Sequence, residues 1–137
     1  MHSEFAIAVH SLVVLAYTPD RLRTSDNIAN SIIIHPVRVR KVLAELRKHG
    51  YIQSKEGAKG GFYLSRDPAS IRLDELYTVF AGDSLVPKWP EVNPACPVGG
   101  HIEEAMQTIF ENVEQGVKER FQQFTIADVL NRILQKA

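Results

Sequence analysis

The chain has 137 residues, of which 45% are hydrophobic and 23% are charged, and its 16 basic and 16 acidic side chains give a net charge of zero. This composition is typical of one globular domain and argues against intrinsic disorder. A single cysteine excludes a disulfide framework and a four-cysteine zinc site within one subunit, and it fits a reducing cytoplasm. The most apolar stretch, residues 5–17, is shorter than the about 20 residues that span a bilayer, so we expect no membrane anchor.

The zero net charge conceals an asymmetry between the two halves of the chain. Residues 1–66 contain ten basic and five acidic residues, a net charge of +5, and the remainder has a net charge of −5. Such asymmetry points to a polyanionic partner for the first half. We expect the acidic half, with glutamates on a solvated helix face, to be turned away from that partner.

Three helices are predicted in the first 50 residues. The first covers about residues 3–17, and because it is almost wholly apolar, we expect it to be buried on most sides. Capping oxygens at residues 24–26 predict a short second helix. The third helix begins near Pro36, where proline costs no hydrogen bond, and it ends at Gly50, a typical C-terminal residue.

The third helix has an apolar stripe and a basic outer side. Apolar residues at i, i+3, i+4 and i+7 indicate one face against the core, and these are Val39, Val42, Leu43 and Leu46. The basic residues are Arg38, Arg40, Lys41, Arg47 and Lys48. Two strand-like runs follow, at residues 51–55 and 62–65, and the glycine-rich segment between them predicts a hairpin with a flexible tip.

The second half is predicted to be helical apart from one long loop. A short helix at residues 73–80 precedes residues 83–100, whose four prolines and lack of periodicity indicate an irregular loop. From Ile102 helical spacing continues for about 24 residues, or roughly 36 Å. That length is more than so small a domain needs for its own core. A terminal helix is predicted after Thr125.

Three helices followed directly by a glycine-tipped hairpin form the pattern of a winged helix-turn-helix domain, a mostly α fold with a small β-hairpin wing. Such a domain lays its third helix in the major groove of double-stranded DNA, and its hairpin reaches neighbouring phosphates. Arg38, Arg40 and Lys41 are candidates for base edges because they lie in the first half of the helix, and Lys59 is a candidate for a phosphate. The full candidate set is Ser25, His35, Val37, Arg38, Arg40, Lys41, Lys48, Lys59, Gly60 and Gly61.

Other interpretations of the basic helix and the glycine-rich segment are less favoured. A basic helix face is often no more than a solvated surface, but the order of elements and the glycine wing favour nucleic acid. A protein–protein interaction module that uses the basic face for an acidic partner stays the alternative. The glycine-rich segment lacks the Gly-Lys-Ser/Thr ending of a nucleotide-binding P-loop.

Four segments carry a resemblance to a known family, residues 43–52, 57–66, 71–79 and 124–130. They resemble the IscR/NsrR/CymR-type bacterial transcription regulators, the Rrf-two family, and the wing segment is the most specific part. The resemblance implies a homodimer, usually a repressor, that binds a pseudo-palindromic promoter site. It also implies that the long C-terminal helices pair across the two-fold axis.

The predicted organisation has three parts. A DNA-binding domain covers residues 1–82, an irregular sensor or linker loop covers residues 83–101, and dimerisation helices cover residues 102–137. The long helix has an apolar stripe that a partner helix could cover or that could fold back on its own domain. The stripe consists of Met106, Ile109, Phe110, Val113, Val117 and Phe121.

Cys96 separates this chain from the best-known members of the family. Those members hold an iron–sulfur cluster on three cysteines between the wing and the dimerisation helix, whereas this loop has one, so we expect no cluster, no other cofactor and no metal. Cys96 precedes a helix and lies near His101, which makes it a candidate thiol sensor, although packing of the loop is the favoured interpretation of a lone cysteine. A small-molecule or protein effector at the loop is equally compatible. We do not expect an enzyme, because no residue is spaced to orient the histidine.

Overall fold

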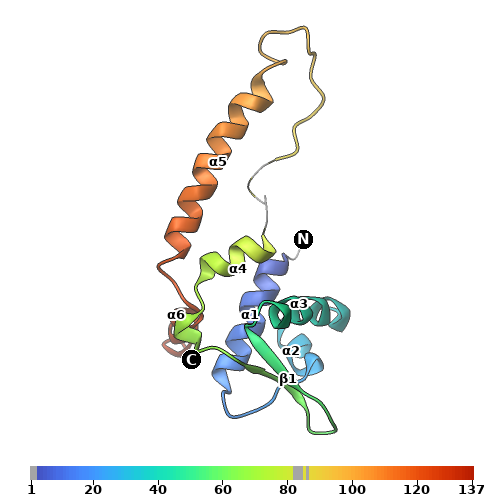
Figure 1. Ribbon diagram of the computed structural model, residues 1–137, viewed down its shortest axis with the longest axis vertical. Helices are drawn as coiled ribbons and strands as arrows, with labels where there is room; N and C mark the ends of the chain where they lie inside the picture. Colours follow the sequence, from blue (N-terminus) through green and yellow to red (C-terminus); the bar gives the residue numbers. More distant parts are fainter. Residues whose placement is uncertain (1–2, 82–84, 86) are drawn as a thin grey trace.

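The computed structural model describes residues 3–81, 85 and 87–137, and it consists of a small helical domain with a hairpin wing and one projecting helix (Figure 1). The predicted boundary between residues 82 and 83 lies outside the described residues. The elements are α1 (Glu4–Tyr17), α2 (Ser25–Ile32), α3 (Pro36–Lys48), β1 (Ile52–Lys55), β2 (Gly61–Leu64), the 3-10 turn η1 (Pro68–Ser70), α4 (Leu73–Phe80), α5 (Ile102–Phe121) and α6 (Ile126–Leu134). Their order is the one predicted from the sequence.

The first two helices begin at the predicted polar caps. The Ser3 hydroxyl accepts a hydrogen bond from Ala6 N–H at 3.0 Å. Thr24 and Asn27 form a reciprocal capping box, in which each side chain accepts from the backbone N–H of the other residue at 3.1 Å. These bonds satisfy donors that have no partner within the first turn of a helix, and so they define where the helices start.

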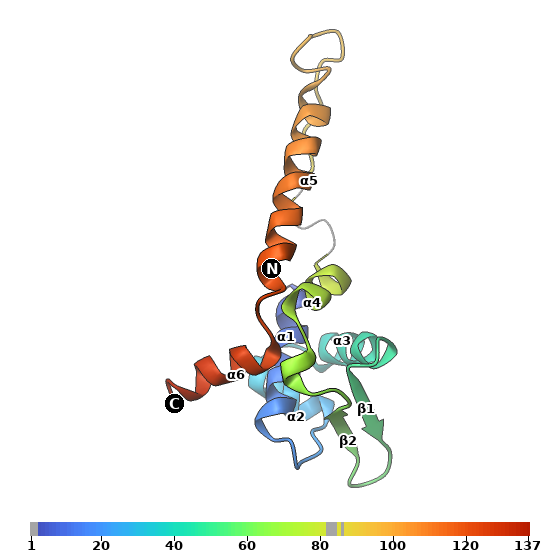
Figure 2. The ribbon, with the colours of Figure 1, turned by 60° about the vertical axis from the view of Figure 1, so that its left-hand side comes forward.

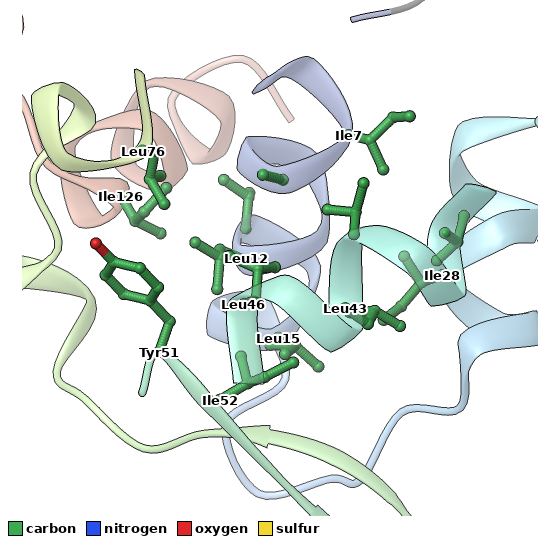
Figure 3. Packing of buried hydrophobic residues seen from close by; sticks show 14 of the residues in the cluster. Ile7, Leu12, Leu15, Ile28, Leu43, Leu46, Tyr51, Ile52, Leu76 and Ile126 are labelled. Carbon is green, nitrogen blue, oxygen red and sulfur yellow. The ribbon is translucent and has the colours of Figure 1, made fainter. Parts of the chain in front are cut away.

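The predicted apolar stripe of α3 is the centre of the hydrophobic core, and all four of its residues are buried. It packs against α1 and α2, and the start of β1 closes the core below (Figure 3). The largest fully buried side chains include Ile7, Leu12, Leu15, Ile28, Leu43, Leu46, Ile52, Ile71, Leu76 and Ile126. The core therefore holds the basic helix by its inner face and leaves the outer face accessible.

The wing is an antiparallel hairpin that is also joined to the α1–α2 connection. Ile52 is paired with Leu64 and Lys55 with Gly61. Phe62 N–H donates to the Arg23 carbonyl at 2.8 Å, and Arg23 N–H donates to the Phe62 carbonyl at 3.1 Å. The hairpin is thereby joined to the helical domain along β2, one residue pair from its tip, and the tip itself extends beyond the domain (Figure 2).

The long helix α5 has 20 residues, so the predicted length of about 24 was wrong. After Phe121 the backbone forms hydrogen bonds with the segment at the start of α4. Leu73 N–H donates to the Phe124 carbonyl, and Ile126 N–H donates to the Ile71 carbonyl, both at 2.9 Å. These tertiary hydrogen bonds end the helix although its apolar periodicity continues.

Helices α5 and α6 have different relations to the domain. Helix α5 extends away from it on the side opposite the wing, and residues 87–101 run beside the N-terminal half of α5 (Figures 1 and 2). Helix α6 turns back and packs against α1, with Ile126 fully buried. An aromatic cluster joins the base of α5 to the domain, since the Phe121 ring centroid lies 5.6 Å from that of Phe5 and 5.4 Å from that of Tyr77.

Candidate nucleic-acid interface

The outer face of α3 is solvent-exposed, and its centre contains both apolar and basic residues. Val37, Lys41, Ala44 and Lys48 lie at i, i+4, i+7 and i+11, directly opposite the buried stripe. All four are exposed. Arg40 and Arg47 are also exposed and border this line on one side, and Arg38 borders it on the other. The predicted basic face is therefore present as one continuous surface on the helix.

The first turn of α3 is organised by His35, the residue before Pro36. The His35 Nδ1 atom accepts a hydrogen bond from Val37 N–H at 3.1 Å. In the neutral imidazole the proton is therefore on Nε2, which is a donor. A donor at a helix N-terminus, where backbone N–H groups also point outward, suits a phosphate oxygen. The predicted DNA contact of His35 stays a prediction, and its capping role is an addition to it.

Lys41, a predicted base-contacting residue, is part of an ion pair within the chain. Its Nζ atom lies 3.5 Å from Glu4 Oε1 at the start of α1, and both side chains are largely exposed. An exposed pair of this kind contributes about 0–1 kcal/mol, so it can exchange for a phosphate at little cost. The role of Lys41 near base edges stays a prediction, and Arg40 is the stronger candidate by position.

The wing tip carries Lys59, which is exposed, on a tight glycine turn. Gly60 N–H donates to the Gly57 carbonyl at 3.0 Å. A Cβ atom at Gly60 would lie 2.1 Å from the Lys55 carbonyl oxygen, and one at Gly61 would lie 2.9 Å from the Arg23 carbonyl oxygen. Gly60 and Gly61 are thus required by close backbone approaches, whatever part they have in DNA contact.

Three wing side chains outside the predicted candidate set lie on the exposed face of the hairpin. Gln53 and Tyr63 form a cross-strand pair, and both are exposed, as is Lys55 two residues further along β1. The signal was available in the sequence, because alternate residues of a strand lie on the same face. Lys55 and Tyr63 extend the candidate surface from the tip along the hairpin.

Arg66 was counted among the basic residues, but it has a structural role at the end of the wing. Its Nη1 atom lies 3.3 Å from Glu75 Oε1 on α4, and its guanidinium lies 5.1 Å from the Tyr51 ring centroid. Burial raises the pKa of Glu75, but hydrogen bonds from Arg72 N–H and from Arg66 outweigh burial and lower that pKa overall. The network joins the wing to α4, so Arg66 adds little to the DNA-facing surface.

Cys96 lies in the segment ahead of α5. Hydrogen bonds from the backbone N–H groups of Gly99 and Val98 lower the pKa of its thiol. We expect the rate of alkylation by iodoacetamide to reach half its maximum at a lower pH than it does for a free cysteine, because the thiolate is the reactive form. Mass spectrometry of the native and the urea-unfolded protein across pH 6–10 measures this, and equal midpoints would contradict it.

An apolar groove of about 750 Å³ lies between α1 and α6. Its walls include Val9, Val13, Val129, Leu130 and Ile133, and Phe121 at the base of α5 also lines it. Helix α1 is buried on most sides, as expected, and its two exposed residues, Ala6 and Tyr17, both line this groove. Arg23 also lines the groove, and its Nε atom is buried without a hydrogen-bond partner among the described residues.

The stripe on α5 is only partly covered by its own chain. Phe121 packs in the aromatic cluster, whereas Ile109 and Val113 are 54% and 47% exposed, and the helix has no buried residue among those described. The glutamates of α5 are exposed as expected with one exception. The Glu114 carboxylate oxygens are buried and have no hydrogen-bond partner in the described part of the chain.

The described residues include no group of three or more histidine, cysteine, aspartate or glutamate side chains that could hold a metal ion. No helix among them is both long enough and apolar enough to cross a membrane.

Comparison with known proteins agrees with this architecture. Residues 1–132 match the Rrf2 family, described as iron-dependent transcriptional regulators. The chain is 32% identical over 134 residues to YwnA of Bacillus subtilis, which is named as an HTH-type transcriptional regulator, and the match covers 97% of this chain and 98% of that one. Both the predicted family and the predicted activity class are found in these relatives.

Solved structures confirm the mostly helical winged-helix fold. A transcriptional regulator from Lactobacillus plantarum is 28% identical, with a TM-score of 0.79 and coverage of 95% of this chain and 89% of that one. CymR, the global cysteine regulator of B. subtilis, has the same fold at 19% identity, with a TM-score of 0.71 and 96% of each chain covered. With its exposed basic face on α3, its glycine-tipped wing and a family match over nearly its whole length, the chain belongs to the Rrf2 family of DNA-binding transcriptional regulators.

Proposed function

We propose that this regulator is a homodimeric repressor that binds a pseudo-palindromic promoter site. The observation that carries the proposal is the exposed outer face of α3, with Arg40, Arg47 and Lys48 beside a wing that presents Lys59. A dimer would place two such surfaces on successive major grooves of one face of the duplex. A repressor of this kind acts in the cytoplasm by occupying the promoter.

Binding-site selection from random duplexes, followed by titration of the selected duplex at several salt concentrations, tests DNA binding. A dimer that contacts about 6–10 phosphates loses about 10³- to 10⁵-fold in affinity between 50 and 200 mM salt. Enrichment of no common sequence, or an affinity independent of salt, would contradict the proposal and favour a protein partner for the basic face. A two-fold repeat in the selected sequence would support the dimer.

Dimerisation is supported by two apolar surfaces that form one continuous region. The stripe on α5 and the groove between α1 and α6 share Phe121. A 20-residue helix that buries none of its residues gains little stability from its own chain, because helical stability in proteins comes chiefly from tertiary packing. We assign the α5 helix of a second copy to this region.

The charge and the shape of these surfaces also fit helix α5 of a second copy. The buried Arg23 Nε is a donor that lacks an acceptor among the described residues, and α5 is rich in glutamate. A carboxylate of the second copy could supply that acceptor. Gly116 lies at i+7 from Ile109 and i+3 from Val113, and nothing lies within 4 Å of its ideal Cβ position. Its lack of a side chain leaves room for a close approach of a partner helix.

We expect Val113→Glu to convert the dimer into monomers, because it places a charge in the centre of the proposed interface. Analytical ultracentrifugation over a range of protein concentrations measures the dissociation constant. Gln115→Glu is the matched control, since it adds the same charge to the opposite, exposed side of α5. An unchanged dissociation constant for Val113→Glu would contradict the assignment of this stripe to the interface.

We also propose that the repressor works without an iron–sulfur cluster and receives its signal at the loop ahead of α5. The donors do not fit a cluster, because the chain has one cysteine, and the described residues around it do not form a group of three ligands. Iron and acid-labile sulfide assays of the anaerobically purified protein test this, and stoichiometric amounts of both would overturn it. Loss of oxidant-dependent release from DNA in a Cys96→Ser variant would identify the thiol as the sensor.

A further inference from the structure

Two large apolar side chains are exposed at the N-terminal end of α3. Ile33, in the turn between α2 and α3, is 87% exposed, and Val37, in the first turn of α3, is 53% exposed. They lie two residues before and two residues after the cap residue His35. Val37 is on the line directly opposite the buried stripe, at the N-terminal end of the basic surface.

The exposure of Ile33 follows from an unusual backbone conformation. Its φ and ψ are 63° and 54°, in the left-handed region, and it is the single residue other than glycine with positive φ in the described part of the chain. A β-branched residue is strongly disfavoured there, whereas glycine and asparagine are tolerated. Ile33 N–H donates to the Ala29 carbonyl at 2.8 Å and so closes α2, a role that glycine would fill with less strain.

The core does not account for an isoleucine at this position. Ile32 and Ile34 are partly buried and pack against the core, and the turn directs Ile33 outward between them. The side chain therefore combines strain in the backbone with exposure to solvent, and it contributes no core packing. Such a combination favours a role in contact with a ligand.

The basic surface around these two residues indicates the kind of ligand. Arg38, Arg40 and Lys41 follow Val37 within about one turn of α3 and would bring the duplex against this end of the helix. Arg47 and Lys48 continue the basic surface to the C-terminal end of α3. In the major groove the C5-methyl group of thymine is the apolar feature of a base edge, and apolar side chains contact it. A polar side chain at either position would lose this contact.

We propose that Ile33 and Val37 read thymine in the operator by packing against C5-methyl groups in the major groove. The inference rests on the proposed DNA binding and adds a specificity element to it. Arginine selects guanine by hydrogen bonding, whereas the apolar pair at the start of the helix selects thymine. We therefore expect A·T pairs in the operator next to the positions that the arginines read. The operator half-site is expected to contain thymine at one or two such positions.

Replacement of each thymine in the selected duplex by deoxyuridine, which lacks only the methyl group, tests the contact. We expect the wild-type affinity to fall about fourfold at one or two positions in each half-site, the value for one buried methyl group. Ile33→Gly and Val37→Ala should bind the thymine duplex more weakly and no longer distinguish uracil at those positions. Val98→Ala, which truncates an apolar side chain that is 69% exposed and remote from α3, is the matched control.

Thermal unfolding distinguishes an effect of a substitution on DNA recognition from an effect on folding. We expect Ile33→Gly to keep or raise the unfolding temperature because it relieves a strained conformation, and Ile33→Asn serves as a second variant that also tolerates left-handed backbone. If wild type binds with strong salt dependence but uracil has no effect, or if the variants lose affinity equally on both duplexes, the thymine contact is overturned. In that case DNA binding itself still stands. Absence of salt-dependent binding by wild type would instead refute the proposed function.

Discussion

Replacement of Arg40 by glutamate is expected to lower the affinity for the selected operator by about 10²-fold at 100 mM salt. Arg40 is exposed in the first half of α3, and its backbone is held by the buried stripe of the same helix. A bidentate contact of arginine with guanine contributes about 1–3 kcal/mol, and the glutamate adds repulsion from the phosphates. Fluorescence anisotropy with labelled operator measures the change.

The more conservative Arg40→Ala variant distinguishes two modes of contact. If Arg40 reads a base, the variant relaxes selectivity at one position of the operator and leaves the salt slope almost unchanged. If it contacts a phosphate, all sequences are weakened alike and the salt slope falls by about one. Lys136→Ala, at the far end of the chain, is the control for loss of a positive charge. Equal effects of Arg40→Ala and Lys136→Ala would contradict a role for the outer face of α3.

Ile126→Ala is expected to lower the free energy of unfolding by about 2–5 kcal/mol, the range for truncation of a fully buried aliphatic side chain. Ile126 is completely buried at the start of α6, and it lies beside Leu76 of α4 in the core (Figure 3). Its backbone N–H donates to the Ile71 carbonyl at 2.9 Å, which holds the start of α6 in place in the core. Urea unfolding followed by circular dichroism measures the loss.

Ile133→Ala on the same helix provides the matched comparison. Ile133 is 48% exposed in one chain and lines the groove between α1 and α6. We expect Ile133→Ala to lower the free energy of unfolding of the monomer by less than about 1 kcal/mol. It should also weaken dimerisation, because a partner in the groove would cover this side chain. Unfolding should therefore be measured in the monomeric Val113→Glu background. Equal losses for Ile126→Ala and Ile133→Ala would contradict the anchoring of α6 in the core.

Local sequence signals correctly placed the elements that build the candidate DNA-binding surface. Caps at Ser3 and Thr24 define helix starts through bonds between residues three apart, and such bonds depend on local sequence alone. The apolar spacing in α3 determines which face is buried, because a helix turns by a constant angle per residue. The basic face opposite follows from the same periodicity.

Contacts between distant residues explain the predictions that failed or were absent. Helix α5 ends early because Phe124 accepts a hydrogen bond from Leu73, 51 positions earlier in the chain. The requirement for Gly61 comes from its approach to Arg23 in another connection. Neither partner can be inferred from residues near the glycine or near the end of the helix.

The sequence by itself determined the charge asymmetry, the order of elements and the face of α3 that is available to DNA, since all three depend on composition and local periodicity. Only the tertiary structure decided how α6 lies on α1, which apolar surface stays uncovered and that Ile33 is directed outward by a left-handed turn. The physical reason is that these features arise where separate elements compete for the same buried volume and the same backbone hydrogen bonds.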